Sequence, residues 1–91
     1  MVGMLAISLA GHDKDQIYVI IKEEEEYVWL SEGRLKPLEK PKRKNKKHIQ
    51  IINKYQDPEI IRKLQNGLSL YNEEIKHIVK IKKQEETHVK N

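Results

Sequence analysis

The sequence predicts a mainly β protein: a small barrel of about five strands followed by a short helical extension. In the first half of the chain, runs of β-branched and aromatic residues recur at roughly 8–12-residue spacing, which is typical of small barrels. From Asp57 onward, apolar residues recur at helical spacing instead. The 91 residues have room for one small domain with an appendage.

Five candidate strands span residues 4–9, 16–22, 27–30, 35–38 and 48–52. In the second candidate strand, Ile17, Val19 and Ile21 share one face, and Tyr18 and Ile20 share the other. We expect the side chain of Tyr18 to face solvent. The fourth is expected to pair back after a turn at residues 31–34, as an edge strand closed by prolines at positions 37 and 41.

Tyr27 and Trp29 share one face of the third strand. We expect this face to form core or half-buried barrel surface, although exposed aromatic rings can also stack on unpaired bases. The chain contains no phenylalanine, which argues against an aromatic-rich RNA-binding sheet of the RRM type.

Two helices are expected in the second half. Asp57 is a good N-cap before Pro58, and Gly67 is a natural stop. A second helix is expected to start with Asn72 as its cap, followed by a frayed polar tail over residues 85–91.

Composition narrows the functional classes. Hydrophobic residues make up 37% and charged residues 35%, and the net charge is only +4. The chain has no cysteine, which excludes disulfides and thiolate zinc sites. It has no apolar stretch near the ~20 residues of a membrane span, and its apolar start is a poor signal peptide, so we expect a cytoplasmic protein without a membrane partner.

The segment from Lys40 to Lys47 holds six basic residues and no acid. Lysine and arginine bind phosphate backbones by displacing condensed counterions, independently of base sequence. The same composition also fits a solvated linker, a targeting signal or a heparin-like patch. By contrast, the acidic run from Glu23 to Glu26 is most simply a solvated loop.

No catalytic arrangement is apparent. The four histidines lack metal-ligand spacing, no serine lies in a nucleophile elbow, and there is no glycine-rich phosphate loop. We therefore expect no enzyme activity, no cofactor, no metal and no small-molecule substrate.

Four segments in order resemble the KOW-type RNA-binding domains. They are SLAGHDK (residues 8–14) with the strand at 17–21, WLSEGRL (29–35), EKPKRK (39–44) and KKHI (46–49). More closely, the chain is similar to small bacterial KOW proteins that resemble an archaeal and eukaryotic large-subunit ribosomal protein. The resemblance covers residues 1–53 as one domain containing the basic segment 40–48. Residues 54–91 match only loosely, as a helical extension with a polar tail.

The resemblance implies an SH3-like barrel that binds RNA, plausibly ribosomal RNA, near large-subunit ribosomal proteins, with the basic segment as a loop. The RNA-binding candidates are the cations of two loops and of the basic segment: His12, Lys14, Arg34, Lys36, Lys40, Lys42, Arg43, Lys44, Lys46, Lys47 and His48. The alternative is a protein-interaction module of the transcription or translation machinery that uses the barrel or the helices.

One position departs from the family pattern. Asp15 stands where these proteins usually carry a glycine. Since aspartate tolerates positive φ better than most residues, we expect the turn to survive with some strain. Asp15 also places an acid beside a loop that the family is thought to present to RNA.

Overall fold

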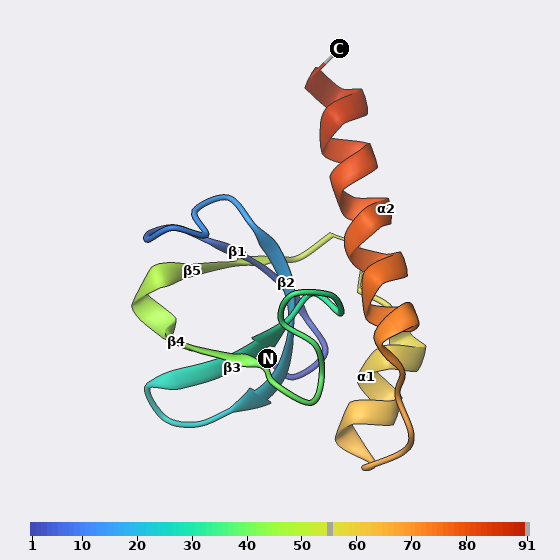
Figure 1. Cartoon of the computed structure of the whole chain (residues 1–91). Helices are drawn as coiled ribbons and strands as arrows, with labels where there is room; N and C mark the ends of the chain where they lie inside the picture. Colours follow the sequence, from blue (N-terminus) through green and yellow to red (C-terminus); the bar gives the residue numbers. More distant parts are fainter. Residues whose placement is uncertain (55, 91) are drawn as a thin grey trace.

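The computed structural model of the chain describes residues 1–54 and 56–90, with side chains described as far as residue 84. Its five strands form one antiparallel sheet in the order β4-β3-β2-β1-β5 (Figure 1). In chain order, the strands are β1 (Leu5–Ser8), β2 (Ile17–Glu23), β3 (Tyr27–Ser31), β4 (Lys42–Asn45) and β5 (Ile49–Ile52). The predicted fold class, a small five-stranded β domain followed by helices, is confirmed.

A short 3₁₀ helix, η1 (Lys46–His48), joins the two edge strands and curls the sheet into a barrel. The carbonyl of His48 accepts a hydrogen bond from Leu9 N at 2.8 Å, just beyond the end of β1. The amide of Lys46 donates to Glu26 O at 2.9 Å, in the turn between β2 and β3. The connection therefore closes one end of the barrel.

Strand β2 is buried on both faces. Tyr18 and Ile20 lie in the barrel interior with apolar side chains of β3, whereas Ile17 and Val19 face the helices. The predicted alternation is confirmed, but the expectation that Tyr18 faces solvent is wrong, since only 2% of Tyr18 is exposed. Closure of the barrel buries the face that an open sheet would leave in water.

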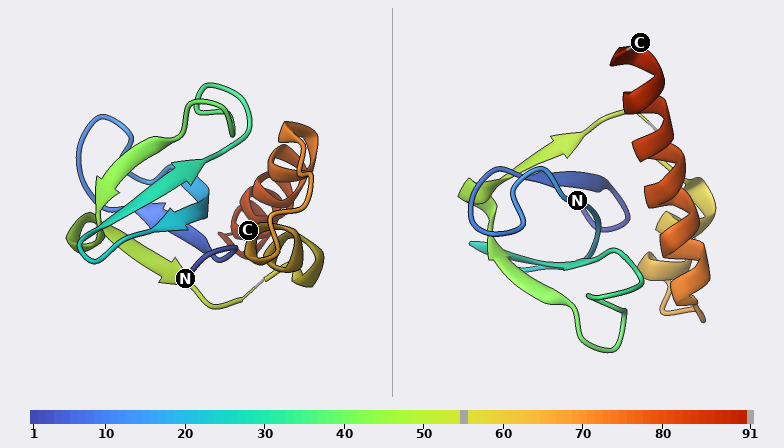
Figure 2. Two further views of the ribbon diagram at one scale, coloured as in Figure 1. Left: turned by 90° about the horizontal axis from the view of Figure 1, so that it is seen from below. Right: turned by 45° about the horizontal axis from the view of Figure 1, so that its top comes forward.

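The helices α1 (Pro58–Gln65) and α2 (Asn72–Lys90) cover the outer face of β1 and β2 (Figure 2). Ile60 of α1 and Ile75 of α2 are 2% and 0% exposed, and they belong to the same apolar cluster as Leu5 and Ile17. Residues after position 54 thus complete the core of the barrel. The backbone of α2 continues to Lys90, while the side chains of the predicted polar tail and Asn91 lie outside the described residues.

The cap of α1 is confirmed and that of α2 is not. Asp57 Oδ1 accepts a hydrogen bond from Glu59 N at 2.9 Å, with Pro58 in the first helical position. At α2, the carboxylate of Glu74 instead accepts from Tyr71 N at 3.0 Å, which is the acidic half of a capping box. Asn72 is occupied elsewhere, because its side chain accepts from the backbone amide of Leu38 at 2.8 Å.

The predicted strand at residues 35–38 is wrong. Those residues belong to the β3–β4 loop, which satisfies its own backbone: Glu32 Oε1 accepts from the amides of Arg34 and Lys36 at 2.9 and 2.5 Å. The pairing partner of β3 is β4, in the middle of the basic segment. The segment predicted as a basic loop is therefore largely a strand followed by a 3₁₀ helix.

Candidate nucleic-acid interface

Strand geometry divides the cations of the basic segment into two sets. In the β3–β4 register, Lys42 lies opposite Leu30 and Lys44 opposite Val28, both buried inner-face residues, whereas Arg43 lies opposite Trp29. Because side chains alternate along a strand, Lys42 and Lys44 lean toward the barrel interior and Arg43 points out. Lys42, Lys44 and Lys46 are half-buried, while the remaining basic residues of the segment are exposed.

Asp13, from the β1–β2 loop, neutralises the inward set. Its Oδ1 lies 2.6 Å from Lys44 Nζ, and its Oδ2 lies 2.9 Å from Lys42 Nζ. Lys44 Nζ also donates to Ser8 Oγ and to the carbonyl of Ala10, both at 2.7 Å. The ammonium of Lys44 is thus fully engaged inside the protein, with only 10% of its side chain exposed.

The same carboxylate organises the tyrosine beneath it. Tyr18 Oη donates to Asp13 Oδ2 at 2.9 Å, and Ser8 Oγ donates to Oδ1 at 3.0 Å. Burial alone would raise the pKa of Asp13, but hydrogen bonds from Lys44, Lys42, Tyr18 and Ser8 together hold that pKa well below its usual range. Burial, followed by the bond to Asp13 and the negative charges of Asp13 and Glu32, raises the pKa of Tyr18 well above its usual range.

The acidic run neutralises a second part of the basic segment. Lys46 Nζ lies 2.8 Å from Glu23 Oε2, and the amino group of Met1 lies 3.1 Å from Glu23 Oε1. These hydrogen bonds, with that of Lys46 the stronger influence, lower the pKa of Glu23. Glu25 and Glu26 line one hollow with Lys46 and Lys47. A polyanion is therefore disfavoured at this corner of the barrel.

Cations lie over the half-buried aromatic rings on the outer face of the sheet. The guanidinium of Arg43 is 4.4 Å from the centre of the Tyr27 ring, and Lys22 Nζ is 4.6 Å from that of Trp29. A register shift between Ile20 and Lys22 brings Lys22 opposite Trp29. The predicted half-buried surface is confirmed, and each ring carries an intramolecular cation–π contact.

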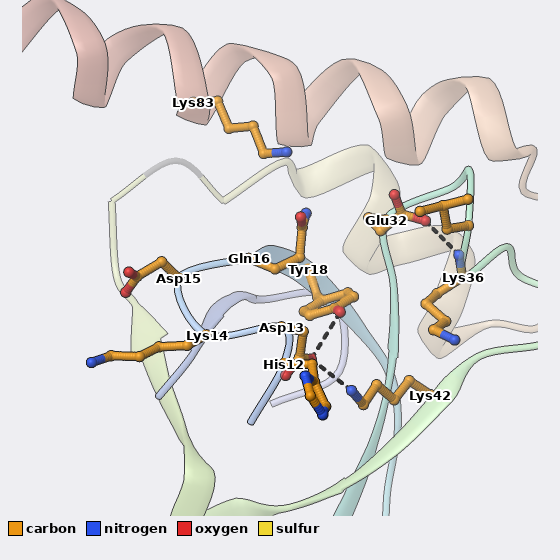
Figure 3. A pocket seen from close by; sticks show the side chains of 11 residues that line it. His12, Asp13, Lys14, Asp15, Gln16, Tyr18, Glu32, Lys36, Lys42 and Lys83 are labelled. Carbon is orange, nitrogen blue, oxygen red and sulfur yellow. Dashed lines mark hydrogen bonds and ion pairs between the residues drawn. The ribbon is translucent and has the colours of Figure 1, made fainter. Parts of the chain in front are cut away.

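Two loops and helix α2 enclose an open groove, which we call the loop groove (Figure 3). The β1–β2 loop contributes its residues 12–16, and Asp15 adopts φ 73°, as the resemblance implies for this position. The β3–β4 loop contributes Leu35 and Lys36, and Lys83 of α2 lies above Gln16 (Figure 3). The lining includes four lysines (14, 36, 42 and 83) and three acids (13, 15 and 32).

Two of these acids already have hydrogen-bond or ion-pair partners within the protein. Asp13 is paired with two lysines, and Glu32 accepts two backbone amides of its own loop. Asp15 is the exposed exception and lies with Lys14 at the outer end of the groove (Figure 3). The electrostatic balance of the loop groove therefore favours an anion.

The eleven predicted site residues do not form one patch. Lys42, Lys44 and Lys46 are paired with carboxylates. Among the described residues, the others are exposed and lie beyond ion-pair distance of any carboxylate: His12, Lys14, Arg34, Lys36, Lys40, Arg43, Lys47 and His48. The structure brings His12, Lys14, Lys36 and Lys42 to the loop groove. Sequence reasoning missed the lysines of α2, whose signal is the helical spacing of positions 76, 80 and 83.

Two negative findings concern other kinds of site. Nowhere in the described part of the chain do three histidine, aspartate or glutamate side chains converge as a metal site requires. Across residues 1–54 and 56–90, no helix is long and apolar enough to cross a membrane.

Comparison with known proteins adds no family assignment. No protein-family model matches this sequence, and no curated protein matches it significantly. The structure itself describes a small five-stranded barrel, packed against two helices, with lysines from two loops lining the loop groove.

Proposed function

We propose that this protein is a non-catalytic RNA-binding module of the KOW type that holds RNA phosphates in the loop groove. Cytoplasmic ribosomes are the proposed location, with ribosomal RNA as the ligand. The observation that carries the proposal is that some lysines of the two loops and the basic segment are paired with carboxylates, whereas others have no such partner. Lys14 and Lys36 remain without a carboxylate partner among the described residues, and they come from the two loops that border one groove.

The polar cluster beneath the groove supports a structural rather than a catalytic role. Ser8, Lys44 and Asp13 lie within hydrogen-bond distance of each other, as a serine nucleophile and its base would. However, Ser8 is 0% exposed: its hydroxyl oxygen accepts from Lys44, and its single proton is shared between Asp13 and the Ala10 carbonyl. A buried hydroxyl with this arrangement of partners has no access to a substrate.

The test is RNA binding measured by fluorescence anisotropy with a labelled ribosomal RNA hairpin. We expect the variant Lys14→Gln/Lys36→Gln to bind about tenfold more weakly and to reduce the salt slope of log K by about 2. The charge-matched control is Lys54→Gln/Arg62→Gln, since neither residue lines the groove and the Arg62–Glu59 ion pair is exposed. Equal affinities for the two double variants would contradict the proposal.

Lys42 and Lys44 are left out of the tested set. Their ammonium groups hold Asp13, so their removal alters the stability of the barrel together with any RNA contact. Ribosome association has a separate test, which is sedimentation of tagged protein through a sucrose gradient at low and high salt. We expect salt-sensitive migration with the large subunit that ribonuclease abolishes.

A protein-interaction module is the second candidate, and exposed apolar side chains favour it. Leu35 is 75% exposed, and Tyr71 is 65% exposed in the loop between α1 and α2. Removal of residues 54–91 is not a clean test, because it would uncover the outer apolar face of the barrel. The variant Tyr71→Ser distinguishes the two candidates instead. If the protein is an RNA binder, this variant retains its RNA affinity and its sedimentation with ribosomes. If the protein is an interaction module, the variant no longer sediments with ribosomes.

A further inference from the structure

A stripe of lysines on α2 borders the barrel. Lys76, Lys80 and Lys83 follow one another at helical spacing, each one position after a buried residue of the core face: Ile75, Val79 and Lys82. The stripe therefore runs along the margin where α2 meets the barrel. Lys76 and Lys80 are both exposed.

The β3–β4 loop is fixed against the start of this stripe. At Gly33, φ is +83°, and a Cβ atom would lie 2.5 Å from Asn72 O and 2.9 Å from Lys76 Cγ, so only glycine permits this approach. The side chain of Asn72 holds the other end of the loop, through its bond to Leu38 N and its bonds to Glu39 at 2.9 and 3.1 Å. Loop and helix thus form two walls at a fixed separation.

Between these walls lies a second groove, which we call the helix groove. Arg34 lines it on the loop side, and Lys76 and Lys80 line it on the helix side. It shares Gln16, Glu32, Leu35 and Lys83 with the loop groove, so the two hollows are continuous. Glu32 is the only acid that lines the helix groove among the described residues, and its Oε1 already accepts two backbone amides.

We propose that a single RNA strand runs from the loop groove into the helix groove, where Arg34, Lys76 and Lys80 contact its phosphates. This inference rests on the proposed function and extends it from the barrel to the helical part of the chain. Charge complementarity supports it, because exposed cations line the helix groove on opposite sides: Arg34 on the loop, and Lys76 and Lys80 on the helix. The rise of a helix separates residues i and i+4 by about 6 Å along its axis, close to the spacing of adjacent phosphates in one extended strand.

The experiment compares three double variants of the full chain with a fluorescein-labelled oligouridylate as the probe. Lys76→Gln/Lys80→Gln tests the helix groove, Lys14→Gln/Lys36→Gln tests the loop groove, and Lys54→Gln/Arg62→Gln is the charge-matched control. Glutamine has nearly the helix propensity of lysine and keeps the Cγ atom that lies near Gly33, so the fold is preserved. Thermal unfolding of each variant checks this.

We expect the helix-groove variant to bind oligouridylate about tenfold more weakly than the control and to reduce the salt slope by about 1.4, the value for two phosphate contacts on a single strand. If this variant binds like the control while the loop-groove variant is weakened, the further inference is wrong and the proposed function stands. If neither variant differs from the control, the proposed function fails as well.

Two further probes separate other ligands. A blunt RNA duplex that binds more tightly than oligouridylate would overturn the single-strand assignment. Polyglutamate that competes as well as oligouridylate would overturn the assignment to RNA, because an acidic protein segment would then satisfy the same cations.

Discussion

Neutralising Asp13 should destabilise the barrel more than removing any exposed charge. The variant Asp13→Asn keeps the size of the side chain but leaves Lys44 without a counter-charge in a place where 10% of its side chain is exposed. Breaking a buried ion pair by removing one partner costs about 3–5 kcal/mol, since the remaining charge stays desolvated. We expect a loss near 3 kcal/mol, because Asp13 retains 13% exposure and Lys42, at 32%, can reorient into water.

Urea denaturation followed by the fluorescence of Trp29 measures this loss, since Trp29 is the only tryptophan and lies on β3. A loss of about 3 kcal/mol lowers Tm by about 12 °C or more in a domain of this size. In the double variant Asp13→Asn/Lys44→Met, the buried charge is removed as well, and we expect recovery of more than half of the loss. An Asp13→Asn protein within about 0.5 kcal/mol of the parent, the usual range for surface changes, would refute the argument.

The pH dependence gives an independent check. The pKa of Asp13 is lower in the folded state than in the unfolded chain, where it is about 3.9. Its contribution to stability is therefore complete above the unfolded-state pKa and is lost as the pH falls toward the folded-state value, by about 1.4 kcal/mol per pH unit. The stability difference between the parent and Asp13→Asn should be constant above about pH 5 and narrow below about pH 4. A difference that stays unchanged down to pH 3 would assign the effect to shape rather than charge.

Three other substitutions have clear expected outcomes in the same denaturation assay. Gly33→Ala should cost about 3 kcal/mol, because its Cβ would meet the backbone of α2 at positive φ; a neutral effect would mean that the loop is not held against the helix. Asp15→Gly should stabilise the protein by up to about 1 kcal/mol, because glycine adopts φ 73° without backbone strain. It should also tighten RNA binding, because it removes an acid from the loop groove. A destabilised Asp15→Gly protein would show that the carboxylate supports the turn. Tyr18→Phe should cost about 1.5 kcal/mol, the value of a hydrogen bond to a charged group, and a cost near zero would mean that Asp13 replaces this donor at once.

The helices α1 and α2 pack on the barrel, so the two parts of the chain cannot be studied by removing one of them. The predicted division into a barrel over residues 1–53 and an extension over residues 54–91 follows the extent of the resemblance, and the change from strand to helix patterning at Asp57 lies close to it. Yet Leu5 and Ile17 of the barrel share one apolar cluster with Ile60 and Ile75 of the helices. Point variants on exposed positions therefore separate the roles of the two parts more reliably than truncation does.

Elements whose signals lie within a few neighbouring residues could be predicted before the structure was known. Alternation over residues 17–21 predicted β2 and its two faces, and Asp57 with Pro58 predicted the start of α1, because strand pleat and helix capping depend on neighbours only a few positions away. The positive φ of Asp15 was expected from the resemblance, because the KOW domains that the sequence resembles usually carry a glycine at this position.

The tertiary structure alone decided where β4 lies and which cations remain available. Lys42–Asn45 has no apolar alternation, so only pairing with β3 reveals it as a strand. Lys44 is engaged because Asp13, 31 positions earlier in the chain, comes within 2.6 Å of it. Arg34 and Lys80 line one groove because the fold packs the β3–β4 loop against α2, although the two residues are far apart in the sequence. Ion pairs and grooves join residues that are distant in sequence, and a pattern of neighbours carries no information about such distances.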